Sequence, residues 1–155
     1  MTDCRQFCSF IVENLLLGAD VRKVQEVVRS LEITKVPSAP RAVRGLANLR
    51  GQVIEVIDLR RCLGIADSAV GDALFHLIFR TADGPISLLV DQVGSVIEIS
   101  EDSPPVYPES LKGRMGEIVS LVYQLPDKLL PVLDMDRLLS DVTAAENRAA
   151  PGDTA

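Results

Sequence analysis

Two stretches of this chain repeat each other at a nearly constant spacing. Residues 53–63 (VIEVIDLRRCL) align with residues 129–139 (LLPVLDMDRLL), which places Asp58 and Asp134 134 − 58 = 76 positions apart. Residues 21–27 resemble residues 93–99 at a spacing of 93 − 21 = 72 positions. Chance similarity between valine-rich strands is the alternative explanation. The spacing favours two similar β units, each holding about five short strands closed into a small barrel.

Short β-branched and apolar runs bounded by turn residues predict strands rather than long helices. A helical turn at Val21–Val24, a short helix at Leu59–Leu63 capped by Asp58 and a short helix at Leu138–Leu139 complete the expected elements. The expected strands are residues 7–12, 15–18, 27–28, 52–57, 74–80, 86–90, 96–99, 117–125 and 128–133. We therefore expect an all-β domain over residues 1–140, with halves at about 7–70 and 71–140. Residues 141–155 lack periodicity and predict a disordered tail.

Composition and charge exclude several classes of protein. Hydrophobic residues make up 47% of the 155-residue chain but aromatic residues only 4%, so the core must be aliphatic. A formal net charge of −6 argues against a nucleic-acid surface, which needs clustered Lys and Arg. No run approaches the ~18 apolar residues of a membrane helix, and the polar N-terminus does not resemble a signal peptide. A cytoplasmic protein that binds no nucleic acid and does not insert into a membrane is expected.

No pattern of residues predicts catalysis, a metal or a cofactor. The one histidine, His76, lies inside an apolar strand, where a structural role is expected. Cys4, Cys8 and Cys62 form an odd set that predicts reduced thiols, and Cys4 with Cys8 lacks the second ligand pair of a zinc site. Asp58 and Asp134 occupy matching places in the two halves, which favours helix capping over catalysis. A small β-barrel enzyme with an acid–base pair assembled from distant residues is the remoter alternative.

Residues 43–51 (VRGLANLRG) are unusual for a surface connection. Gly45 and Gly51 bracket an Asn-Leu-Arg sequence, just before the most hydrophobic strand of the first half. These glycines indicate backbone conformations or close approaches that a Cβ would obstruct. Arg50 then lies at a turn, where its planar guanidinium suits a carboxylate or carbonyl groups of a partner. A local ion pair that holds the turn is an equally good interpretation of Arg50.

Residues 44–59 (RGLANLRGQVIEVIDL) resemble the signature of CheW-like domains, and residues 23–27 (KVQEV) resemble a second marker of that family. The resemblance extends over residues 7–140. It implies two intertwined, SH3-like, five-stranded β-barrels with short connecting helices. Two departures stand out: Glu55 replaces a frequent proline, and Val12-Glu13-Asn14 replaces a Leu-Gly turn. These departures predict that the strand at residues 52–57 is exposed or edged differently, and that the first hairpin is shifted, in a divergent member of the family.

The resemblance also implies a function. Proteins of this family are non-enzymatic adaptors that bridge a chemoreceptor's cytoplasmic tip and the regulatory domain of a chemotaxis-type histidine kinase. The residues that match the receptor-binding positions are Val24, Glu26, Gly45, Asn48 and Arg50. Val24 would give apolar contact, Glu26 and Arg50 charge complementarity, and the glycines a close approach of the partner helix. The nearest alternative is a CheW-like competitor or modulator of kinase arrays in a non-motility pathway.

Overall fold

The protein consists mainly of short strands. The structure is a computed structural model that describes residues 4–67, 74–107, 111 and 113–149, with side chains up to residue 143. In chain order the elements are β1 (Cys4–Val12), β2 (Leu15–Asp20), the 3-10 helix η1 (Val21–Lys23), β3 (Val24–Arg29), β4 (Ile33–Thr34), β5 (Val43–Leu49), β6 (Gln52–Asp58), α1 (Leu59–Cys62), β7 (Phe75–Thr81), β8 (Gly84–Val90), β9 (Gln92–Ser100), α2 (Arg114–Ile118), β10 (Val119–Gln124), β11 (Leu129–Leu133) and α3 (Met135–Ala149).

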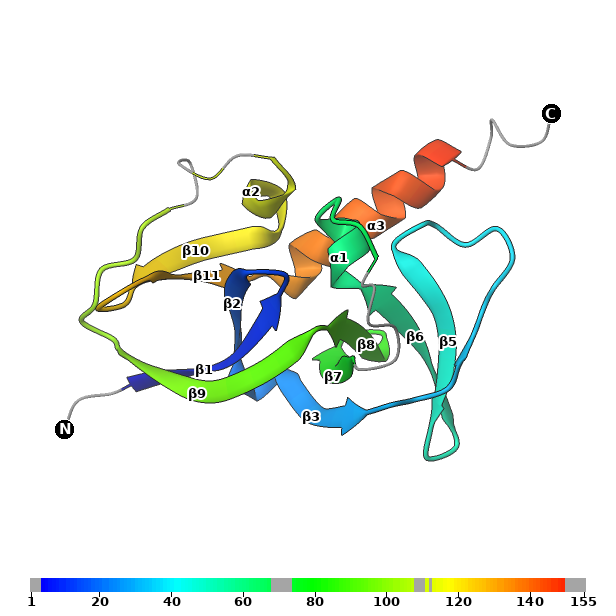
Figure 1. Cartoon of the computed structure of the whole chain (residues 1–155), viewed down its shortest axis with the longest axis horizontal. Helices are drawn as coiled ribbons and strands as arrows, with labels where there is room; N and C mark the ends of the chain where they lie inside the picture. Colours follow the sequence, from blue (N-terminus) through cyan, green and yellow to red (C-terminus); the bar gives the residue numbers. More distant parts are fainter. Residues whose placement is uncertain (1–3, 68–73, 108–110, 112, 150–155) are drawn as a thin grey trace.

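The strands form two sheets of matching order. One sheet has five strands in the order β10-β11-β2-β1-β9, and the other has six in the order β3-β7-β8-β6-β5-β4. Apart from the two-residue strand β4, each sheet has a pair of antiparallel hairpins joined by one parallel contact, β11 with β2 and β6 with β8. The expected all-β fold of two intertwined five-stranded barrels is confirmed. Figure 1 shows the first sheet on one side of the molecule and β5 with β6 on the other.

The two halves of the chain exchange their first hairpins. The β1–β2 hairpin pairs with β9 and β11 from the second half, while the β7–β8 hairpin pairs with β3 and β6 from the first. The sequence repeat therefore corresponds to two copies of one strand order, but neither barrel is a contiguous half of the chain. A division at residues 70 and 71 does not separate the barrels, because each barrel contains strands from both sides of it.

The repeated aspartates occupy equivalent positions in the two copies. The backbone N–H of Asp58 donates to the carbonyl of Ala42, and that of Asp134 donates to the carbonyl of Ile118, both at 2.8 Å. Each side chain then accepts from the backbone of the following helix: Asp58 from the N–H of Arg60 at 2.9 Å and Asp134 from that of Arg137 at 3.2 Å. The expectation that both aspartates cap helices is confirmed.

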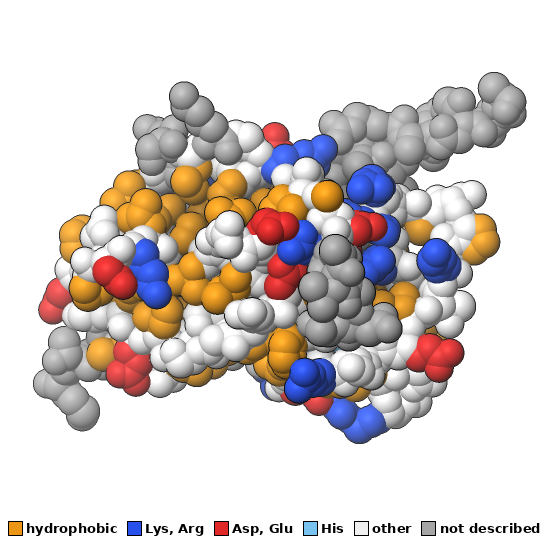
Figure 2. Space-filling view, viewed as in Figure 1, with side chains coloured by type: hydrophobic (Ala, Val, Ile, Leu, Met, Phe, Trp, Pro, Cys, Tyr) orange, Lys and Arg blue, Asp and Glu red, His pale blue; other side chains and the backbone are white. Residues whose placement is uncertain are grey.

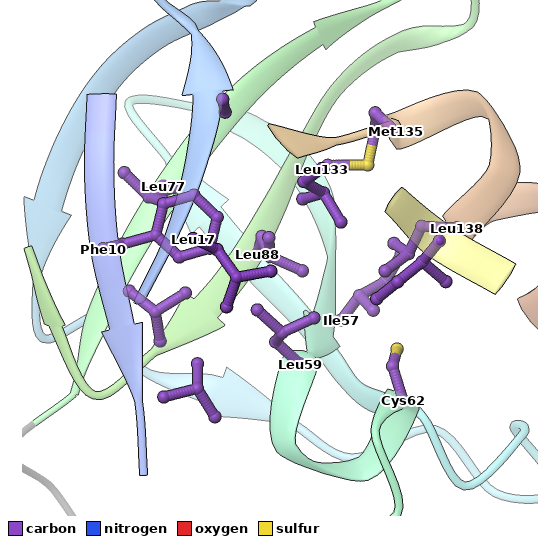
Figure 3. Close-up of a cluster of buried hydrophobic side chains, with 14 of the residues drawn as sticks. Phe10, Leu17, Ile57, Leu59, Cys62, Leu77, Leu88, Leu133, Met135 and Leu138 are labelled. Atoms are coloured by element: carbon purple, nitrogen blue, oxygen red, sulfur yellow. The ribbon is translucent and has the colours of Figure 1, made fainter. Parts of the chain in front are cut away.

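Three mainly aliphatic cores hold the barrels together. One lies inside each barrel: Ile54 and Val56 belong to the first, and their repeat equivalents Leu130 and Val132 belong to the second. The third core lies between the two sheets and includes residues from β1, β2, β6, β7, β8, β10, β11, α1 and α3. Figure 3 shows how its side chains converge: the labelled residues are Phe10, Leu17, Ile57, Leu59, Cys62, Leu77, Leu88, Leu133, Met135 and Leu138. Because both exchanged hairpins contribute side chains to this shared core, their burial there stabilises the fold.

Several local expectations were wrong. Residues 43–49 are a strand, β5, rather than a connection, and residues 117 and 118, expected to begin a strand, belong to the helix α2 instead. The expected disordered tail from Asp141 is wrong for residues 141–149, which continue α3 because Val142 is buried in the central core. Residues 150–155 lie outside the described part of the chain. The replacement of a frequent proline by Glu55 does not place β6 at an edge, since β6 lies between β8 and β5.

Candidate docking site

The five candidate residues lie on three neighbouring parts of one sheet. Val24 and Glu26 are in β3, Gly45 and Asn48 are in β5, and Arg50 is in the turn between β5 and β6. Although β3 is an edge strand and β5 lies near the opposite edge, the sheet closes on itself and brings them together. Arg50 Nη2 donates to Glu26 Oε2 in an ion pair across that closure.

This ion pair is open to solvent on the side of Arg50. The side chain of Arg50 is 66% exposed and that of Glu26 is 28% exposed, so a partner can reach the guanidinium while Glu26 lies deeper. The hydrogen bond from Arg50 lowers the pKa of Glu26 and raises the pKa of Arg50, and a second hydrogen bond from Gln25 adds to the effect on Glu26. Both groups are therefore charged at neutral pH. The local ion pair expected as one role of Arg50 is present.

The turn that carries Arg50 is held in a specific conformation. Arg50 has a φ of 52° and Gly51 a φ of 90°, and Leu49 pairs with Gln52, which is the geometry of a two-residue type I′ hairpin. Asn48 Oδ1 accepts from the backbone N–H of Gly51 at 2.7 Å and staples the turn. A positive φ is uncommon for arginine, and such conformations concentrate at functional positions. The local fold thus presents Arg50 on a preorganised turn.

The local packing of the backbone requires a glycine at position 45. It lies at a β-bulge between β5 and β6 with a φ of 147°, and a Cβ at this position would lie 2.1 Å from the backbone oxygen of Thr34. The short strand β4 therefore requires this glycine, independently of any partner helix. Gly51 differs, because a Cβ built there meets nothing within 4 Å.

Apolar side chains surround the turn on the outer face of β5 and β6. Val53 is directly opposite Asn48 in the strand register and is 64% exposed, and Leu46 on β5 is also exposed. Val24, in contrast, is half-buried and packs against the central core. Sequence reasoning missed Val53 and Leu46. Their alternation with buried residues, visible once residues 43–49 are taken as a strand, is the signal that points to them.

The distribution of surface side chains supports contact with another protein. Figure 2 shows hydrophobic side chains gathered over β10, β11 and β2, away from the β5–β6 turn, with most Lys and Arg toward the other end of the molecule. Contiguous apolar surface of this kind is typical of protein–protein interfaces. Within the described residues, no three His, Cys, Asp or Glu side chains are placed to hold a metal ion together. Across the same residues, no helix is both long and apolar enough to cross a membrane.

His76 lies in the interior rather than at this surface. It is 2% exposed, and its Nδ1 lies 2.7 Å from the hydroxyl of Ser87. Burial lowers its pKa. The expected structural role agrees with this position, since the ring and its partner Ser87 are both buried and no carboxylate is among its hydrogen-bond partners in the described residues.

Comparison with known proteins identifies the family. The model of the CheW-like domain matches residues 6–143. The chain is 29% identical over 139 residues to Chemotaxis protein CheW of Thermotoga maritima, covering 89% of both chains. It is 27% identical to Chemotaxis protein CheW of Treponema pallidum, covering 87% of this chain and 82% of the other. The crystal structure of the scaffolding protein TtCheW from Thermoanaerobacter tengcongensis superimposes with a TM-score of 0.77 at 30% identity, covering 85% of this chain and 90% of the other. The chain belongs to the CheW-like domain family.

Proposed function

We propose that this protein is a non-enzymatic cytoplasmic adaptor that couples the cytoplasmic tip of a chemoreceptor to the regulatory domain of a chemotaxis-type histidine kinase. The observation that carries the proposal is the position of Arg50, a largely exposed guanidinium on a rigid hairpin turn of a CheW-like domain. A receptor tip is a helical hairpin, and its carboxylates and carbonyls are suitable partners for a planar guanidinium.

The geometry of the turn explains how such a partner would bind. Arg50 is restrained by the type I′ turn, by the hydrogen bond from Gly51 to Asn48 and by the ion pair with Glu26. Restraint before binding reduces the entropy that association costs. Val53 and Leu46, beside the turn, offer apolar contact to a helix packed next to the guanidinium. The five candidate residues therefore divide into one contact residue, Arg50, and groups that shape its surroundings.

A binding experiment with matched variants tests this role. Arg50→Ala should fold normally but bind the isolated receptor tip at least about tenfold more weakly, because a paired, charged interface group is removed. Arg50→Lys should also bind more weakly, since lysine cannot reproduce the planar fork. Arg114→Ala is the control: Arg114 is 51% exposed and pairs with Asp141 between α2 and α3. Unchanged affinity in Arg50→Ala would remove Arg50 from the docking site.

A reconstituted array distinguishes coupling from competition. Receptor tip, kinase and this protein are mixed, and kinase activity is followed as the protein is titrated. A coupling adaptor should make kinase activity depend on the receptor. A protein that only competes for one partner would lower receptor control at every concentration, which would contradict the proposed coupling.

A further inference from the structure

The one imidazole of the chain is held by hydrogen bonds on both of its nitrogens. Nε2 of His76 accepts from the backbone N–H of Leu31 at 3.4 Å, and Nδ1 lies 2.7 Å from Ser87 Oγ. A backbone N–H can only donate, so Nε2 must be unprotonated while the bond to Leu31 exists. The neutral ring therefore carries its proton on Nδ1 and donates it to Ser87. Protonation of Nε2 would place two N–H donors face to face.

The ring also borders a cavity that adjoins the chain between β3 and β4. The cavity has a volume of about 300 Å³. Its lining residues are Ser30, Leu31, Glu32, Ile33, Arg44, Leu74, His76 and Leu89. Although His76 is almost fully buried, this cavity gives the Nε2 side of the ring space for a water molecule.

The groups around His76 are apolar on the neighbouring strands and charged in the cavity lining. On the flanking strands the residues opposite His76 are Val28 and Leu89, both apolar. Among the charged residues of the cavity lining, Glu32 comes from the connection and Arg44 from β5, and Arg44 forms an ion pair with Asp58 at 3.2 Å. On β3, Arg29 lies over the ring of Phe75 instead, 5.2 Å from its centre.

From this geometry we propose that His76 is a proton-sensitive latch, which holds the connection after β3 while the ring is neutral and releases it when Nε2 is protonated. The latch bears on the docking site, and in this respect the inference rests on the proposed function. β3 carries Val24 and Glu26, and the released backbone begins two residues after the end of that strand. Loss of the Leu31 bond loosens the C-terminal end of β3 and weakens partner binding in acid.

The direction and range of the effect follow from the burial of the ring. Burial lowers the pKa of His76 below its ordinary value of 6.5, so the latch is closed at neutral pH and opens on the acid side of that value. Ser87 remains an acceptor for Nδ1–H in both states, so the ring stays anchored to β8 while the connection moves. The switch is therefore local and does not require the barrel to unfold.

Nuclear magnetic resonance of the intact protein tests the latch directly, because the single histidine gives an unambiguous signal. The imidazole resonances of His76 and the backbone amide of Leu31 are followed between pH 7.5 and 5. We expect the two to titrate together below pH 6.5, with a smaller protection of the Leu31 amide in acid, measured relative to the intrinsic exchange rate at each pH. A Leu31 amide that does not respond to protonation of His76 would overturn the inference. So would a ring that stays neutral until the whole protein unfolds.

Binding measurements separate this inference from the proposed function. Affinity for the receptor tip is measured at pH 7.5 and 5.5 for the wild type and for His76→Gln, whose side-chain oxygen can still accept from Leu31. We expect the wild type to lose at least about threefold more affinity in acid than the variant. Equal losses in both proteins would overturn the latch. Absence of binding at pH 7.5 would refute the proposed function instead, and the co-titration of His76 and Leu31 would still decide the latch.

Discussion

Arg60 binds both carboxylate oxygens of Asp91, with Nε 2.8 Å from Oδ1 and Nη2 2.6 Å from Oδ2. Arg60 lies in the first turn of α1, whereas Asp91 joins β8 to β9 where the chain passes from one sheet to the other. Nη1 of Arg60 also donates to Glu13 in the β1–β2 turn at 2.8 Å. The pair therefore ties together both exchanged hairpins. Bidentate geometry of this kind is the strongest form of ion pair in proteins.

Asp91→Asn should destabilise the protein without changing its fold. The side chain of Arg60 is 9% exposed and that of Asp91 is 18% exposed, so the substitution leaves a nearly buried charge with a weaker partner. We expect the free energy of unfolding to fall by about 2–4 kcal/mol, since removal of one member of a buried pair is costly. Urea denaturation followed by circular dichroism measures the change.

The control for that variant is Glu13→Gln, because Glu13 contacts the same guanidinium but is 49% exposed. Its effect should stay within about 1 kcal/mol. The dependence of stability on pH in the acid range gives a second check. Arg60 holds the pKa of Asp91 below its ordinary value of 3.8, so the stabilisation is complete above that pH and is lost as Asp91 is protonated at lower pH. Equal stability of wild type and Asp91→Asn at pH 7 would contradict this role.

Gly45→Ala should disrupt the region around β4. The added methyl group would lie 2.1 Å from the backbone oxygen of Thr34, and backbone cannot move aside as a flexible side chain can. We expect a loss of about 2 kcal/mol or more in unfolding free energy. Gly64→Ala is the matched control, because Gly64 also has a positive φ but an added Cβ there meets nothing within 4 Å. It should cost about 1 kcal/mol from backbone strain alone. Similar losses in both variants would show that the contact with Thr34 is unimportant.

The sequence predicted most strands because their β-branched runs are local signals. It did not predict β5, since Gly45 and Asn48 are turn formers that disguise the alternation of buried Val43, Ala47 and Leu49. The exchange of hairpins between the two barrels could not be predicted from the sequence either. Contacts such as that between β1 and β9 join segments far apart in the chain, and no local pattern specifies which barrel a hairpin completes.

The sequence named the candidate residues, whose role in binding stays a prediction, but it did not give their arrangement. Family resemblance pointed to Glu26 and Arg50, yet their contact depends on closure of the sheet between β3 and the β5–β6 turn. The second role of Asn48, as a staple of the turn, follows from the positive φ values of Arg50 and Gly51. The sequence Asn-Leu-Arg-Gly before an apolar strand is compatible with a hairpin turn, because Gly51 suits the second position of a type I′ turn.

Reaction with a thiol reagent should distinguish the exposed Cys4 from the buried Cys62. Burial is the main cause that raises the pKa of Cys62 to about 12, so at pH 8 only about one thiol in ten thousand is ionised. Cys4 is exposed and should react fast, while Cys62 should react only after unfolding. Ellman's reagent with and without denaturant measures both phases. Cys4→Ser should abolish the fast phase, and a fast phase that persists at full amplitude in this variant would contradict the assignment.

Val142→Ala should show that the C-terminal helix stabilises the domain. Val142 is 7% exposed and joins Leu138, four residues earlier, in the core between the sheets. Removal of two buried methyl groups should lower the free energy of unfolding by about 1–3 kcal/mol, measured by urea denaturation. The neighbouring Thr143 is exposed on the same helix, so Thr143→Ala should change it by no more than about 0.5 kcal/mol. If both variants were as stable as the wild type, residues beyond Ser140 would add nothing to the stability of the fold. That result would match a disordered tail and contradict the role of Val142.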